Sequence, residues 1–198
     1  MMLASDNFNR SDNADLGANW DVVTGEDSFK IVSNQVVPNI VSNDAGESNN
    51  SVTWPNDQYS QVKCTETSTS ANIGPGVLIR AAVGARTYYR TVISSAGSAN
   101  VEIAKFVAGT YTQLATRTSA LISGDLLYIE ARANTLLVKK NGVALGATIS
   151  DSAITAGRPG ISYSSQGTAP SVDDWEGGNL LLAKKTFVRQ AVNRASTY

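Results

Sequence analysis

Apolar and polar residues alternate along most of the chain in short segments, separated by Gly, Asn, Ser and Asp. Such alternation is typical of β-strands with one buried face, and the separating residues favour turns. The predicted strands cover residues 28–39, 51–55, 58–68, 76–84, 87–95, 100–109, 111–119, 125–134, 135–142, 158–165 and 171–178. Turn signals at intervals of about 8–12 residues predict an all-β protein, an antiparallel sandwich or barrel.

Three tight turns are predicted between these strands. Asn141-Gly142 tolerates positive φ and favours a type I′ hairpin, while Asn134 and the pair Ala108-Gly109 mark two further turns. The Asn- and Ser-rich segment 42–51 is interpreted as a loop. Alternation within 125–134 separates a core face with Leu127, Ile129 and Ala131 from an outer face with Tyr128, Glu130 and Arg132.

The length and charge of the chain limit which classes of partner are expected. Its 198 residues fit one domain with a tail, and 16 Lys and Arg against 17 Asp and Glu give a net charge of -1. Without a basic field, nucleic acid is not an expected partner. No apolar run approaches the ~20 residues that span a bilayer, so a membrane is not expected either.

The use of cysteine and histidine limits the chemistry further. The chain has one cysteine, Cys64, and no histidine. This excludes an intrachain disulfide, a Ser/His/Asp triad, a Cys/His pair and any zinc site with histidine ligands. The first residues lack a basic segment followed by an apolar one, so no secretory signal peptide is predicted and assembly in the host cytoplasm is expected.

No catalytic residues are predicted. Glycoside hydrolysis requires two carboxylates about 5–9.5 Å apart, which on one strand means acids two or four positions apart. Asp174 and Glu176 satisfy this spacing, but they lie beside Gly177-Gly178 at the end of the β region, where solvated acids are more common. Candidate glycan contacts are instead Tyr88 and Tyr128 as stacking platforms, with Arg90 for a charged ligand.

The aromatic residues near the two ends of the β region are assigned to the core. Phe8 and Trp20 are spaced irregularly among Asp, Asn and Gly, and Trp175 lies in a similar setting near the other end. Large aromatic side chains flanked in this way are more often buried than exposed.

The last residues, 179–198, differ from the rest of the chain because they are apolar and basic and contain no acid. One interpretation is a tail that docks on a partner through Leu181, Phe187, Val188 and Arg189, with a helix over about 183–194 as part of it. The alternative is a final strand followed by a frayed end.

The order of motifs resembles the concanavalin A-like (laminin G-like) jelly-roll domains of phage virion and bacterial extracellular proteins. The matching motifs are DNFNR with LGANW, FKIVSNQV, GPGVLIRA, YYRTVI, VEIAKFVAGTYTQLA, GDLLYIEARANTLLVKKNGVAL, DSAITAGRPGISY and VDDWEG. The resemblance implies an antiparallel two-sheet jelly-roll sandwich over residues 1–178, with a short tail over 179–198. It also implies that the first and last strands lie side by side.

No cofactor is predicted, but some relatives hold a structural calcium ion near such a junction, and the resemblance makes Asp6 and Asp173 the candidate ligands here. Both belong to segments rich in the oxygen ligands that calcium prefers, but no EF-hand spacing is present. The alternative is that Asp6, Asn7 and Asp12 cap turns by accepting hydrogen bonds from nearby backbone.

The resemblance does not fix an activity, because such folds include glucanases, alginate lyases, lectins and structural modules. The closely spaced acids of the glucanases are missing, and alginate-lyase-like members use a His and Tyr pair, so a non-enzymatic protein is predicted. The main hypothesis is a phage virion component on the virion surface: a head decoration, fibre or tail-associated protein. Its tail would bind other virion proteins or copies of itself. The alternative is a carbohydrate-binding module that recognises a polysaccharide or a cell-surface glycan.

Overall fold

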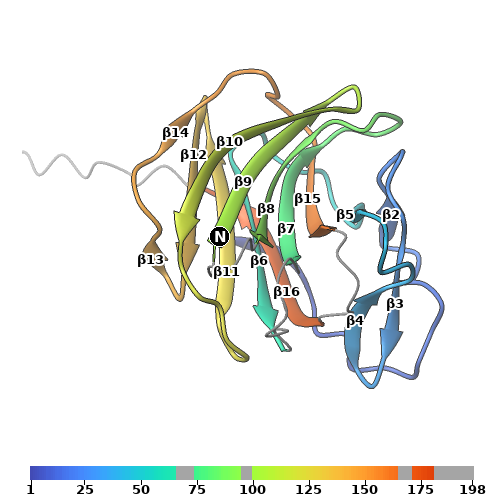
Figure 1. The fold of residues 1–198 in the computed structure, drawn as a ribbon. Coiled ribbons are helices and arrows are strands. Elements are labelled where there is room, and N and C mark those ends of the chain that lie inside the picture. The colour runs from blue at the N-terminus through green and yellow to red at the C-terminus, as the bar shows by residue number, and fades with distance from the viewer. Residues whose placement is uncertain (66–73, 95–99, 165–170, 181–198) are drawn as a thin grey trace, which may run out of the picture.

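The structure is a computed structural model that describes residues 1–65, 74–94, 100–164 and 171–180 (Figure 1). In these residues the chain forms two antiparallel sheets that face each other. The described residues include no helix, and so none long and apolar enough to cross a membrane. The predicted all-β sandwich is confirmed.

Sheet A has nine strands in the order β13-β12-β11-β6-β16-β4-β3, with β1 beside β16 and β14 beside β12. Its strands are β1 (Met2–Asp6), β3 (Phe29–Val32), β4 (Gln35–Pro38), β6 (Gln58–Cys64), β11 (Leu126–Arg132), β12 (Thr135–Lys140), β13 (Val143–Ala144), β14 (Ile149–Ser150) and β16 (Val172–Asn179). Sheet B has seven strands in the order β10-β9-β8-β7-β15-β5-β2. Its strands are β2 (Trp20–Val22), β5 (Ala45–Asn49), β7 (Gly74–Ala81), β8 (Tyr88–Ser94), β9 (Asn100–Val107), β10 (Thr110–Thr118) and β15 (Arg158–Ser164).

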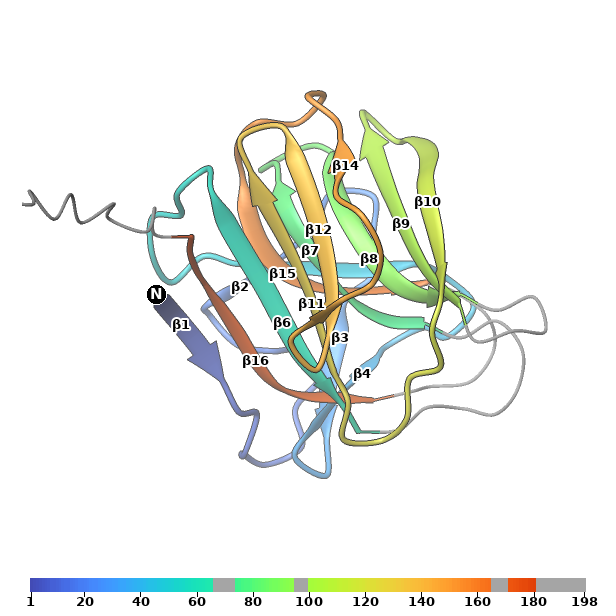
Figure 2. The same ribbon diagram turned by 90° about the vertical axis from the view of Figure 1, so that its left-hand side faces the viewer.

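The first and last described strands are neighbours in sheet A. Strand β1 pairs antiparallel with β16, so that Asp6 lies opposite Trp175 (Figure 2). Strand β6 hydrogen-bonds along the other side of β16. The predicted contact between the two ends of the jelly roll is therefore confirmed.

An aromatic cluster fills the core near this junction. The rings of Trp20 and Trp175 meet edge to face with centroids 4.8 Å apart, and Trp54 packs on Trp175 at 6.0 Å. Phe8 lies 5.9 Å from Trp20 and is fully buried. The core assignment of Phe8, Trp20 and Trp175 is confirmed, and such aromatic pairs contribute about 0.5–1.5 kcal/mol each beyond the area they bury.

The structure differs from the prediction in three segments. Residues 28–39 form two strands, β3 and β4, joined by a turn in which Ser33 and Asn34 have φ values of 51° and 63°. Residues 51–55 lie outside the strands, and the supposed loop 42–51 contains the buried strand β5. In contrast, the Asn141-Gly142 turn is confirmed, with both residues at positive φ.

Strand β5 was not predicted because its sequence, AGESN, has no apolar alternation. Its Glu47 is only 2% exposed, and the carboxylate Oε1 accepts a hydrogen bond from the Phe29 backbone N–H at 2.7 Å. The neighbouring strand also approaches very closely, since a Cβ on Gly160 would lie 1.9 Å from the Glu47 carbonyl oxygen. A hydrogen-bonded carboxylate and a close backbone contact therefore replace the usual apolar side chains.

Candidate functional site

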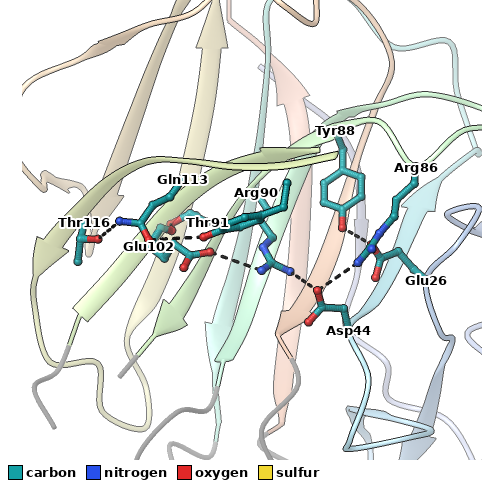
Figure 3. A network of polar contacts seen from close by, with 10 residues as sticks. Glu26, Asp44, Arg86, Tyr88, Arg90, Thr91, Glu102, Gln113 and Thr116 are labelled. Atoms are coloured by element: carbon teal, nitrogen blue, oxygen red, sulfur yellow. Dashed lines mark hydrogen bonds and ion pairs between the residues drawn. The ribbon is translucent and has the colours of Figure 1, made fainter. Parts of the chain in front are cut away.

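The outer face of sheet B carries a small apolar cluster. Charged residues lie beside it, and Figure 3 shows their polar contacts. Strand β8 shows how the two faces divide. Tyr89 packs in the core between the sheets, whereas Tyr88 joins Leu78 and Phe106 in the outer cluster. These three outer residues are at most 2% exposed. Alternation along β8 places Arg90 on the same outer face as Tyr88.

Two arginines of this face stack on one aromatic ring and share one carboxylate. The Cζ atoms of Arg86 and Arg90 lie 4.1 and 5.0 Å from the centre of the Phe106 ring. The Asp44 Oδ2 accepts hydrogen bonds from Arg86 Nη2 at 3.2 Å and from Arg90 Nη1 at 3.1 Å. Arg90 Nη2 also donates to Glu102 Oε1 at 3.4 Å, which places Arg90 between two carboxylates (Figure 3). We call these residues, together with Glu26, the charged network.

Glu26 is the most buried acid of the charged network. Its Oε1 accepts hydrogen bonds from Arg86 Nε at 2.6 Å and from the Tyr88 hydroxyl. Burial raises the pKa of Glu26, while the hydrogen bonds from Arg86 and Tyr88 act in the opposite direction. Tyr88 is itself fully buried. The prediction that the Tyr88 ring serves as a stacking platform is therefore wrong.

The exposed aromatic ring of this face belongs to Tyr111, on the edge strand β10. Tyr111 is 44% exposed, and its ring centre lies 5.5 Å from that of the buried Phe106. The Arg90 Cζ lies 6.0 Å from the Tyr111 ring centre. Partial burial, together with the charge of Glu102 and a hydrogen bond to it, raises the pKa of Tyr111 to about 12, so the hydroxyl stays protonated at neutral pH. The ring is thus held by buried neighbours but remains open to a ligand.

Neutral polar groups continue from Tyr111 along the same strand. The register of β10 against β9 puts Gln113 and Thr116 on the face that Tyr111 occupies, and Gln113 Nε2 donates to Thr116 Oγ1 at 3.0 Å (Figure 3). Both side chains are exposed. An amide and a hydroxyl beside an open ring supply donors and acceptors suited to the hydroxyl groups of a sugar.

A depression lies at the other end of the charged network. Its volume is about 540 Å³, within the range of roughly 300–1,000 Å³ found for small-molecule sites. Its lining is almost entirely polar and consists of Gly25, Glu26, Asp27, Ser42, Asn43, Asp44 and Arg86. The outer face of sheet B therefore combines a ring, a charged network and a polar depression.

The other predicted glycan contact, Tyr128, lies on the outer face of sheet A. Its ring stacks on Tyr59 with centroids 5.3 Å apart, and Lys139 Nζ lies 4.6 Å from its ring centre. The Tyr128 hydroxyl donates to Glu130 Oε2 at 2.6 Å. The structure therefore brings Tyr88 and Arg90 together on the outer face of sheet B, whereas Tyr128 lies on the other sheet.

The proposed calcium ligand Asp6 is occupied by hydrogen bonds. Its two carboxylate oxygens accept from the Arg10 guanidinium at 2.7 and 3.1 Å. Oδ1 also accepts from the Phe8 backbone N–H at 2.9 Å, and Oδ2 from Trp20 Nε1 at 3.0 Å. The turn-capping alternative is thus confirmed for Asp6, and a carboxylate surrounded by donors does not fit a cation.

Asp174 and Glu176 line a depression of about 230 Å³ together with Asp6, whereas Asp173 is not part of its lining. Asp173 Oδ1 accepts from the Asp174 backbone N–H at 2.8 Å. A β-bulge follows, in which Asp174 has a φ of 48° and forms an ion pair with Lys63 at 3.0 Å. Despite the bulge, Asp174 and Glu176 line the same depression, as their spacing predicted. In the part of the chain that the structure describes, no group of three or more His, Cys, Asp or Glu side chains could hold a metal ion.

The predicted docking residues Leu181, Phe187, Val188 and Arg189 lie outside the described residues, as does the helix predicted over 183–194. Among the described residues, the sequence offered Tyr111 and Arg86 only as members of larger sets of aromatic and arginine side chains, and it gave no indication of Glu26 or Asp44. Tyr111 and Gln113 are two positions apart on a predicted strand, and this spacing alone could have indicated that they share one face. No local pattern links Glu26 or Asp44 to Arg90.

Comparison with known proteins identifies the fold. No protein-family model matches the chain, and no curated protein matches it. Solved structures do: the carbohydrate-binding module CBM66 from Bacillus subtilis has 14% identity and a TM-score of 0.64, covering 83% of this chain and 99% of that one. A legume lectin-like domain from Entamoeba histolytica has 18% identity and a TM-score of 0.56, covering 82% and 91%. The Bacillus licheniformis β-glucanase has 10% identity and a TM-score of 0.58, covering 90% and 98%.

These similarities define the class of protein by its architecture. The chain has the concanavalin A-like jelly-roll fold, as the order of its motifs suggested. At such identities the likeness concerns the fold alone, because this fold hosts both binding proteins and enzymes.

Proposed function

We propose that this protein binds carbohydrate on the outer face of sheet B and does not cleave it. The observation that carries the proposal is the exposed ring of Tyr111, supported from below by Phe106 and flanked by the amide of Gln113. An open aromatic face beside fixed polar groups is the arrangement that stacks on a sugar ring and bonds to its hydroxyls. The descriptions of similar structures as a carbohydrate-binding module and a lectin-like domain support it.

The state of the carboxylates favours binding over hydrolysis. Asp44 and Glu102 are both paired with Arg90, and the side chain of Glu26 is fully buried. A general acid must reach the glycosidic oxygen, and a nucleophile must reach the anomeric carbon. A buried Glu26 reaches neither, and the two paired acids are held by the arginine. The absence of catalysis stays a prediction for a direct assay.

Affinity electrophoresis in gels containing soluble polysaccharides tests the proposal. Wild-type chain is expected to be retarded by at least one polysaccharide, and Tyr111→Ala to bind it about tenfold more weakly, since stacking contributes on the order of 1 kcal/mol. Tyr128→Ala is the matched control, because it removes a tyrosine ring from the outer face of the opposite sheet. Wild-type mobility unchanged by a broad panel of polysaccharides would overturn the proposal, as would equal loss in both variants.

The virion role stays a prediction. The descriptions of similar structures favour the carbohydrate-binding alternative over it. A displayed jelly roll that binds a glycan remains compatible with both hypotheses.

A further inference from the structure

We infer that the site on sheet B selects neutral glycans and rejects glycans that carry carboxylate or sulfate groups. This inference rests on the proposed function and concerns the charge of its ligand. The charge that a ligand meets on this face is set by which charged groups are exposed and which are already paired.

The two arginines of the charged network donate hydrogen bonds to carboxylates of the protein. Arg90 is 4% exposed, and its two terminal nitrogens point to Asp44 and Glu102. Arg86 donates through Nε to Glu26 and through Nη2 to Asp44, and it covers the ring of Phe106. A guanidinium that recognises a carboxylate or sulfate does so with two parallel N–H donors facing the ligand. Both arginines direct two of their N–H groups to protein carboxylates instead, although Arg86 keeps 28% of its side chain exposed beside the depression.

The remaining charge of the face is negative. Three carboxylates, those of Glu26, Asp44 and Glu102, belong to a network with two guanidinium groups. Asp27 adds a further carboxyl group to the lining of the neighbouring depression. An anionic sugar placed between Tyr111 and the depression would therefore lie near more carboxylate than guanidinium charge, and its charge would be repelled where water is partly excluded.

The groups that stay open are suited to uncharged hydroxyls. Gln113 and Thr116 are exposed and neutral, and Tyr111 offers its ring. The amide of Gln113 and the hydroxyl of Thr116 can each donate to and accept from a sugar hydroxyl. A neutral sugar gains these hydrogen bonds without bringing a like charge close to Asp44.

Matched pairs of polysaccharides that share a backbone provide the test. We would compare hydroxyethylcellulose with carboxymethylcellulose, methyl-esterified with de-esterified pectin, and dextran with dextran sulfate. The full chain is expected to bind the neutral member of at least one pair, and to bind its acidic counterpart at least tenfold more weakly. Added salt should leave neutral binding unchanged and strengthen any acidic binding, because salt screens repulsion.

Two variants connect this selectivity to the site. Glu102→Gln and Asp27→Asn each remove one negative charge with little change of shape, and each is expected to reduce the neutral-to-acidic preference several-fold. Glu102→Gln removes a partner of Arg90 and could disturb folding. Asp27→Asn leaves the ion pairs of Arg90 in place and therefore tests the charge effect independently. Glu130→Gln on the outer face of sheet A is the matched control, since it changes the net charge equally and should leave the preference as it is.

The outcomes separate the two claims. Preference for the acidic members, with affinity that falls as salt is added, would overturn the charge inference and leave carbohydrate binding intact. Equal affinity for both members of every bound pair would also overturn it. Failure to bind any member of any pair would remove the proposed function and this inference together.

Discussion

Replacing Glu47 with Gln is expected to stabilise the protein at neutral and alkaline pH, and to have little effect in acid. Glu47 lies on β5 in the interior and is only 2% exposed. Burial raises its pKa from the ordinary value of 4.5 to about 7; the hydrogen bond from the Phe29 N–H opposes this rise, whereas the charges of Asp15 and Asp21 add to it. Gln retains a carbonyl oxygen that can accept from Phe29 but carries no charge.

The magnitude follows from the two pKa values. The difference between about 7 and 4.5 corresponds to ~3 kcal/mol at about 1.4 kcal/mol for each pH unit. Because the folded state holds the proton more tightly, the stability contributed by Glu47 is fully present below its unfolded pKa. That stability is lost as the pH rises through the folded pKa. The advantage of Glu47→Gln over wild type should therefore grow from near zero in acid to ~3 kcal/mol above neutrality.

Urea unfolding followed by tryptophan fluorescence at a series of pH values between about 4.5 and 8 measures this difference. The free energy of unfolding of the variant, minus that of wild type at the same pH, is the quantity to plot. A rise with a midpoint between the two pKa values is the expected result. A difference that stays constant across the series would refute the reasoning, because it would mean that Glu47 ionises alike in the folded and unfolded states.

Three further predictions concern stability. Arg80→Met should lower the free energy of unfolding by ~3 kcal/mol or more in urea titrations, because the buried guanidinium donates to three backbone carbonyls; Arg80→Lys should not restore it, since lysine lacks the planar fork. Gly160→Ala should cost on the order of 1–3 kcal/mol and lower the thermal midpoint in calorimetry, because the new Cβ would meet the carbonyl of Glu47. Chelation by EDTA, or addition of calcium, should leave the thermal midpoint unchanged, because Arg10 occupies both oxygens of Asp6; a midpoint that rises with calcium would contradict this.

The fold could be predicted where one face of a strand is apolar and the other polar. Strand β11 is the clearest case: Leu127, Ile129 and Ala131 are fully buried, while the residues between them lie on the outer face. The prediction failed for strand β5 because Glu47 occupies a core position, where its carboxylate accepts a hydrogen bond from the Phe29 backbone on β3. Periodicity records hydrophobicity and therefore cannot register a buried carboxylate.

The site could be predicted only in part, because its charged groups come from distant places in the chain. Glu26 and Asp44 lie outside the strands, whereas Arg90 and Glu102 lie on β8 and β9, and the sheet order brings them together. Spacing along one strand cannot reveal a network whose residues come from two strands and from the loops between strands. Arg90 was a predicted glycan contact, but its partners Asp44 and Glu102 could not be identified from the sequence.

The burial of Arg90 changes what this face can do. An exposed arginine would attract acidic ligands. Arg90 instead forms ion pairs with Asp44 and Glu102 and is not available to contact a ligand. Phe106 supports both arginines from below and packs against Tyr111, so the same ring positions the charged network and the exposed aromatic platform. The position of Tyr111 and the charge of the face therefore depend on one another, and a ligand that stacks on the ring must also tolerate the surplus of carboxylate beside it.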